Sequence, residues 1–437
     1  MRRKKALMAL CAWRLLAACE TTDRPGDDDP DPMGSGASIR LEVFPEGVPS
    51  ATGASANADL VAFQDGDGDW TAVAGTGGVY QLAVHADRYA VAIGCSGTGT
   101  RFYYQSVAEA GQLAATGCFH APDTVTVAIK ATGGEPGLSQ IWIGDTFRFA
   151  APGEPETLAV AKGTQDIFAR GFEPLFGEDV GVRVYRGPAL DIEGDQQISI
   201  DWSQARPVET YPLAITGVSD PGLWATDASY LVAGGHGFRT VKQAISAATT
   251  YATVPAALRR PGELTRVEAS ETRNVNPGPN EVYPLLLRSA FQQLTTPGPV
   301  TLLRGDLVAI ASPTIDTDAV SQLSVTLPIP PSKLGHTRST ASFTTEAPFG
   351  LGRRQDLIVR PGWAAGASTV TLTVPDLRNL AGWTPDMELY GRTEVDWAIT
   401  VDDQDQPFDA PAVDTRGVAC TLIGKQTLMR QLAGGAL

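Results

Sequence analysis

Short runs in which large apolar residues alternate with other residues recur along most of this chain, and turn residues interrupt them at short intervals. In YAVAIGCS, the residues Tyr89, Val91, Ile93 and Cys95 fall on one side of an extended chain and smaller residues fall on the other. A period of two is typical of a β-strand with one packed face. The 46 glycines and 31 prolines are spread evenly and supply the turns between short strands. The pattern therefore predicts an all-β protein.

The spacing of the runs predicts tandem antiparallel β-sandwich modules. No repeat is strict enough for a solenoid or a propeller. The expected divisions are a cleaved signal at 1–18, an acidic tether at 19–36, one sandwich at 37–120, a second at 121–217, and a β-rich region of one or two domains at 218–437.

Two segments of the last region are ambiguous. Residues 239–252 could line a helix face with Val241, Ile245 and Tyr251, but their threonine content and the following Pro255 favour strand. The segment IGKQTLMRQLAGG, which begins at Ile423, predicts a short helix.

The N-terminus is typical of an export signal, with basic MRRKK followed by an apolar run too short to span a membrane. The run ends in Leu16-Ala17-Ala18-Cys19, which resembles the lipobox of bacterial lipoproteins. The resemblance implies cleavage before Cys19 and attachment of fatty acyl chains to it, which together anchor a chain stably. Because Arg14 interrupts the apolar run, an ordinary secretory signal cut at a nearby small residue is the alternative.

The acidic charge of the chain limits the classes of partner that it can bind. Residues 19–36 are acidic, rich in Pro, Gly and Ser, and almost free of apolar residues, so we expect a disordered tether. The formal net charge is −15, and loss of the five basic residues of 1–18, which contains no acidic residue, brings it to −20. Such a charge argues against nucleic acid. We expect a location in the cell envelope, on the outer membrane or cell surface, with the membrane contacted through the lipid.

Three cysteines remain after Cys11 leaves with the signal and Cys19 is acylated. In an exported protein, two cysteines within one small module usually pair, so we expect a disulfide between Cys95 and Cys118. Cys420 is then a buried inert thiol or, alternatively, a bond to another chain.

The segment AFQDGDGDWTAV places Asp65, Asp67 and Asp69 at alternate positions, as in an EF-hand calcium loop. However, the sixth position of that loop must be glycine and is Trp70, and the twelfth must be glutamate and is Thr76. The Asp-Gly pairs suit a tight hairpin turn. We therefore interpret the segment as a turn, with a weak calcium site as the alternative.

The first sandwich, with its meander and this acidic hairpin, resembles the immunoglobulin-like or carboxypeptidase-regulatory-like β-sandwiches of bacterial surface lipoproteins. The resemblance is one of architecture, and it implies a display or binding module rather than a reaction.

Signals for catalysis are weak. The sequence Gly94-Cys95-Ser96-Gly97-Thr98 lacks the second glycine of a nucleophile elbow, and no phosphate-binding or dinucleotide fingerprint occurs, so no cofactor is expected. The histidines are scattered singly, without the short spacing of a zinc site. Carboxylates that meet only in space remain an option, with Asp191, Glu193 and Asp195 as loop candidates. The four histidines are His85, His120, His236 and His336.

Tryptophans could provide stacking platforms for sugars, although large aromatic residues usually fill sandwich cores. We expect most of them to be packed, with Trp70 beside the acidic turn as the best candidate for an exposed ring. The others considered are Trp142, Trp202, Trp224, Trp363, Trp383 and Trp397.

These features favour a lipid-anchored, non-catalytic binding, adhesion or scaffold protein for a protein or glycan partner. The alternatives are a secreted hydrolase with its site in C-terminal loops and an accessory subunit of an envelope complex.

Overall fold

The computed structural model confirms the all-β prediction, since strands dominate and the described helical turns are short 3-10 segments. Cys19 lies outside the described residues, as do 1–18 and 19–36, for which the sequence predicts a signal and a tether. The structure describes residues 37–427 except for 45–54, 110–111, 119–122, 135–136, 151–155, 176–177, 218–223, 233–237, 245–247, 275–280, 304–309, 311–322, 346–351, 390–393 and 409–413.

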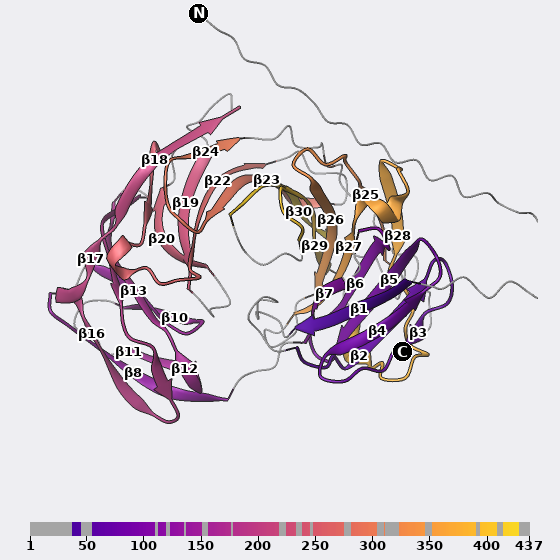
Figure 1. The fold of residues 1–437 in the computed structure, drawn as a ribbon, viewed down its shortest axis with the longest axis horizontal. Coiled ribbons are helices and arrows are strands. Elements are labelled where there is room, and N and C mark those ends of the chain that lie inside the picture. The colour runs from indigo at the N-terminus through magenta and orange to yellow at the C-terminus, as the bar shows by residue number, and fades with distance from the viewer. Residues whose placement is uncertain are drawn as a thin grey trace, which may run out of the picture. The chain divides into compact units, whose positions relative to one another are not determined.

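The described strands form four groups that follow one another along the chain (Figure 1). In the first group, the small sheet has the order β4-β1-β7, with β1 antiparallel to β4 and parallel to β7. The large sheet runs β3-β2-β5-β6, and all its pairs are antiparallel. The strands are β1 (Ala37–Phe44), β2 (Leu60–Asp65), β3 (Thr71–Ala72), β4 (Val79–Val84), β5 (Arg88–Cys95), β6 (Gly99–Ser106) and β7 (Gln112–Thr116).

The second group repeats this strand order. Its small sheet runs β11-β8-β16, again with one antiparallel and one parallel pair, and its large sheet runs β10-β9-β13-β14. The short strands β12 and β15 pair with each other, and β17 pairs with β14. The strands are β8 (Thr124–Thr132), β9 (Leu138–Ile143), β10 (Thr146–Ala150), β11 (Glu156–Ala161), β12 (Gly163–Gln165), β13 (Ile167–Leu175), β14 (Glu178–Arg186), β15 (Leu190–Ile192), β16 (Gln196–Asp201) and β17 (Arg206–Pro207). The 3-10 turn η1 (Trp202–Gln204) lies between β16 and β17.

The third group has the same order once more, with a small sheet β21-β18-β24 and a large sheet β20-β19-β22-β23. The segment YPLAITG was expected in the sandwich that ends at 217, but it lies in β18, which pairs with strands of this third group. The segment 239–252 contributes strand, as expected, to β20 and β21. The strands are β18 (Glu209–Thr216), β19 (Trp224–Leu231), β20 (Phe238–Ala244), β21 (Thr250–Thr253), β22 (Leu264–Asn274), β23 (Glu281–Leu294) and β24 (Val300–Leu303), with η3 (Ala256–Leu258) between β21 and β22.

The fourth group pairs β25 with β28 and has a large sheet of order β27-β26-β29-β30. The short helix predicted from Ile423 is wrong for its described part. Ile423–Thr427 continue β30, because their backbone pairs with β23 on one side and β29 on the other. The elements are β25 (Ser324–Pro328), β26 (His336–Thr345), β27 (Arg353–Val359), η4 (Pro361–Ala364), β28 (Thr369–Thr373), η5 (Pro385–Met387), β29 (Glu394–Gln404) and β30 (Thr415–Thr427).

Hydrogen-bonded strand pairs join the large sheets of different groups. β14 meets β20 at Glu178 and Ala244, β23 runs antiparallel to β30, and β6 runs parallel to β27. The second, third, fourth and first groups are therefore connected in that order by backbone pairing, which differs from their order along the chain.

These junctions bury faces that an isolated sandwich would expose. In β5, Tyr89, Val91 and Ile93 face the core of the first group, as the alternation predicts. The opposite face was expected to be unpacked, but Ala90 and Ala92 are fully buried against apolar residues of the fourth group. Small side chains on this face let the two groups approach closely, and dense packing of this kind stabilises their contact.

Candidate functional site

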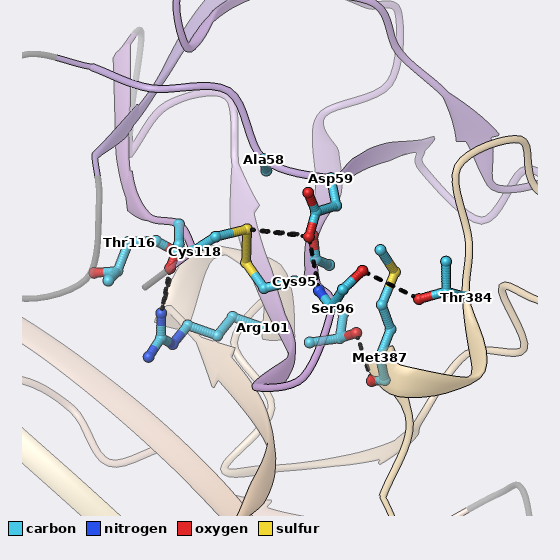
Figure 2. The surroundings of a disulfide bond; sticks show 12 residues. Ala58, Asp59, Cys95, Ser96, Arg101, Thr116, Cys118, Thr384 and Met387 are labelled. Atoms are coloured by element: carbon cyan, nitrogen blue, oxygen red, sulfur yellow. Dashed lines mark hydrogen bonds between the residues drawn. A yellow bond between two sulfur atoms is a disulfide. The ribbon is translucent and has the colours of Figure 1, made fainter. Parts of the chain in front are cut away.

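The predicted disulfide is present, and it connects the two sheets of the first sandwich. Cys95 ends β5, Cys118 follows β7, and their Cα atoms are 5.1 Å apart (Figure 2). Both cysteines are buried. Cys420 is free and buried, in agreement with the inert-thiol interpretation, and burial raises the pKa of its thiol although Arg288 acts in the opposite direction.

Polar contacts fix the chain on either side of this disulfide. The backbone N–H of Ser96 donates to Asp59 Oδ2 at 2.8 Å, and Arg101 Nη1 donates to the carbonyl oxygen of Gly117 at 3.0 Å (Figure 2). Arg101 also approaches Asp356 of β27, with Nε 3.3 Å from Oδ2. The arginine therefore links the cysteine-containing segment to the fourth group.

The turn after Cys95 contacts η5 of the fourth group directly. Ser96 Oγ and Thr384 Oγ1 lie 3.2 Å apart, and Thr100 Oγ1 donates to the carbonyl oxygen of Met387 at 3.0 Å (Figure 2). The backbone N–H of Gly97 donates to the carbonyl oxygen of Asp386 at 3.2 Å. The disulfide thus holds in place the turn through which two groups meet, which is a structural role.

The acidic segment forms the turn of the β2–β3 hairpin, and two of its aspartates are bound by neighbouring groups. Asp65 accepts hydrogen bonds from the backbone N–H groups of His85 and Ala86, at 3.0 and 2.9 Å, and lies 3.1 Å from His85 Nδ1. Partial burial raises the pKa of Asp65, but these hydrogen bonds outweigh it and the net pKa is lowered. Asp67 pairs with Arg88 at 2.6 Å, whereas Asp69 is exposed.

No group of three or more potential metal ligands occurs within the part of the chain that the structure describes. Instead, Asp65 accepts hydrogen bonds from backbone N–H groups, and Asp67 forms an ion pair with Arg88. This arrangement fits the turn interpretation of the segment.

The other catalytic candidates that the structure describes lie in separate places. Ser96 lies in the turn described above, and the exposed His336 begins β26. Asp195 accepts a hydrogen bond from the backbone N–H of Thr126 at 2.8 Å, and Asp191 is exposed in β15. His120 and His236 lie outside the described residues.

The expectation that Trp70 presents an exposed ring is wrong. Its side chain is half-buried and meets Phe102 edge-to-face, with ring centroids 6.0 Å apart. Contact with the apolar cluster between the first and fourth groups explains this position. Most of the remaining tryptophans are packed, as expected: Trp142, Trp202, Trp224, Trp363 and Trp397 are buried and Trp383 is half-buried.

Among the described residues, the exposed aromatic rings belong instead to Phe147 and Phe149 on β10, which are 51% and 50% exposed. They share one face of a short strand, and their ring centroids are 6.0 Å apart. Phe147 also lies 6.0 Å from the ring of Trp142 on the paired strand β9. Among the described strands, β10 pairs with β9 alone, so its other edge offers backbone groups to a partner.

Sequence reasoning missed this surface, although TFRFA contains its signal. Phenylalanines two residues apart fall on the same face of a strand, and Arg148 between them points to the other face. Arg148 pairs there with Glu156, with Nε 3.1 Å from Oε2. The sequence could not show that this aromatic face stays uncovered by the rest of the described chain.

Comparisons with known proteins add little. No family model matches the chain, and no curated protein matches it. A solved structure described as the Bacillus anthracis TIE protein is similar over 57% of this chain and 47% of that chain, with 10% sequence identity and a TM-score of 0.16. The matched part therefore spans less than half of that protein, and a TM-score this low carries no argument about fold or function.

In the described part of the chain, no helix has the length and the apolar character needed to cross a membrane.

Proposed function

We propose that this chain is an exported lipoprotein of the cell envelope that binds a protein partner without catalysing a reaction. The observation that carries the binding role is the exposed pair Phe147 and Phe149 on an edge strand. Exposed aromatic residues supply much of the binding energy at protein interfaces. An unpaired strand edge adds backbone hydrogen bonds to an extended partner segment.

The packing beneath this pair of phenylalanines supports the same role. Trp142 is buried on the same face as Phe147, between Phe147 and Phe168 of β13, so the exposed rings rest on a rigid aromatic row. A preorganised surface loses little conformational freedom on binding. The partner segment would lie along β10, with its own apolar side chains on Phe147 and Phe149.

The anchor is the second part of the proposal. Leu16-Ala17-Ala18-Cys19 supplies the acceptor cysteine, and the acidic tether of 19–36 would hold the sandwiches away from the membrane. Labelling cells with radioactive palmitate tests this part. We expect label in the wild-type chain and none in Cys19→Ala, and label retained by Cys19→Ala would contradict the anchor.

Selection of random peptides on the full-length Cys19→Ala chain tests the binding surface. We expect selected peptides to alternate apolar and polar residues and to bind saturably. A second chain that also carries Phe147→Ser and Phe149→Ser should bind them about 30-fold more weakly, which corresponds to a hot spot of about 2 kcal/mol. The matched control carries Leu303→Ser and Ile423→Ser, which remove two other exposed hydrophobic side chains. Equal binding by all three chains would refute the proposed surface.

A further inference from the structure

An apolar pocket lies where the third and fourth groups share one sheet. β23, β30, β29 and β26 are paired side by side there, and residues of all four strands line a pocket of about 230 Å³. The end of β24 forms one wall, and the segment 330–334 that precedes β26 forms the other.

The lining of this pocket is mainly aliphatic. Val401 and Val418 are buried in the sheet beneath it, and Leu302 and Leu334 come from the two walls. Leu303 stands at the pocket with 62% of its surface exposed. An aliphatic side chain left this open to water is stabilised when an apolar ligand covers it.

Two cationic side chains, Lys333 and Arg416, also line the pocket. Arg416 is 65% exposed and uses Nε to contact Asp405 Oδ2 at 3.1 Å. Asp403 also lines the pocket, and its carboxylate binds the segment 330–334. It accepts hydrogen bonds from Ser332 Oγ at 2.6 Å and from the backbone N–H of Lys333 at 2.8 Å. Asp403 and Asp405 balance the formal charge of these two side chains. Among the described residues, however, Arg416 uses only Nε of its guanidinium, so Nη1 and Nη2 can donate a bidentate pair of hydrogen bonds to a carboxylate.

We propose that this pocket binds a small amphipathic carboxylate, with its aliphatic chain over Val401, Val418 and Leu303 and its carboxylate beside Arg416 and Lys333. The size supports a short chain. An engineered apolar cavity of about 150 Å³ takes up benzene, and pockets for drug-sized molecules begin at about 300 Å³. A pocket of about 230 Å³ lies between the two, which suits a chain of roughly eight carbons. This site is separate from the β10 surface and does not depend on it.

Calorimetric titration of the full-length Cys19→Ala chain with octanoate tests the proposal. We expect saturable binding of one octanoate per chain. Leu303→Trp should abolish it, because the larger side chain fills the pocket from an exposed position and need not disturb the core. If that variant melts at a lower temperature, Leu303→Glu at the same exposed position replaces it, because it removes apolar surface and repels a carboxylate.

The head-group contact is tested separately with 1-octanol, which has the same chain length and no charge. Arg416→Gln should weaken octanoate about fivefold, as expected for one exposed ionic contact, and leave 1-octanol unchanged. Arg148→Gln, an exposed arginine on β10, is the matched control and should change neither affinity. Absence of saturable octanoate binding at millimolar concentration, or binding that Leu303→Trp leaves intact, would overturn the proposal.

Discussion

A Cβ atom on Gly99 would lie 1.8 Å from the carbonyl oxygen of Arg354, and the backbone of Gly99 has a φ of +118°. The two residues are partners at the start of the parallel β6–β27 pairing, and Arg354 N–H donates to the carbonyl oxygen of Thr98 at 2.8 Å. The first and fourth groups therefore meet here backbone to backbone, at a distance that only glycine permits.

Substitution of Gly99 by alanine should weaken this junction. Gly97, in the same turn, is the matched control, since its φ is +82° but a Cβ there would meet nothing within 4 Å. Gly97→Ala should cost only the backbone strain, about 1–2 kcal/mol of unfolding free energy. Gly99→Ala adds the clash with Arg354 and should cost about 1–3 kcal/mol more. Urea unfolding measures both losses, and equal losses would show that the close approach does not matter.

Removal of the disulfide should lower stability through the unfolded state. The bond closes a loop between cysteines 23 residues apart, which corresponds to about 3 kcal/mol in the chain-entropy estimate. We expect the Cys95→Ala, Cys118→Ala chain to lose about that amount in denaturant unfolding. Reductant should destabilise the wild type and leave the double variant unchanged, because Cys420 is free. A reductant effect of the same size on both would contradict this assignment.

The buried ion pair of Arg186 and Glu263 should be sensitive to removal of either charge. Their side chains are 2% and 1% exposed, and Glu263 also accepts a hydrogen bond from Tyr230. Burial, together with Glu263, raises the pKa of Tyr230. Glu263→Gln removes the closer of the two carboxylates that contact Arg186 and leaves Asp166, whose Oδ1 lies 3.3 Å from Nη2. We expect a loss of about 3 kcal/mol, at the low end for a broken buried pair.

An exposed pair supplies the control for that measurement. Asp376 and Arg378 have side chains 32% and 48% exposed, so Asp376→Asn should cost less than about 1 kcal/mol. Thermal unfolding of both variants under one buffer gives the comparison. Similar losses would mean that burial does not amplify the Arg186–Glu263 interaction.

Asp65 should make stability depend on acidity. Its folded pKa lies below the reference value of 3.8, because the hydrogen bonds from Ala86 and His85 outweigh the effect of burial. A lowered folded pKa contributes stability that is fully present above the unfolded pKa and is lost as pH falls through the folded pKa. The stability advantage of wild type over Asp65→Asn should therefore be largest above pH 3.8 and shrink as the solution is acidified below it. An advantage that is constant down to pH 2 would contradict this reading of the turn.

The sequence by itself was enough for the strand character of the chain and for the Cys95–Cys118 bond. Both depend on local information: the alternation in YAVAIGCS assigns sides to β5, and two cysteines in one small module have each other as nearest partners. The same locality explains the error at Ile423, where a segment able to form a helix is held as strand by β23 and β29. Tertiary pairing overrides weak local preference.

Only the tertiary structure decided how the groups join and which surfaces stay open. The pairing of Gly99 with Arg354 spans most of the chain and is made by backbone groups, which every strand carries alike, so no side-chain pattern marks it. Likewise, alternation shows that Ala90 has the opposite face from Tyr89 but not that another group covers it. Phe147 and Leu303 have the same hydrophobic character as residues of the core. Their exposure follows from the absence of a covering strand in the described structure, which is a property of the assembled sheets and not of the local sequence.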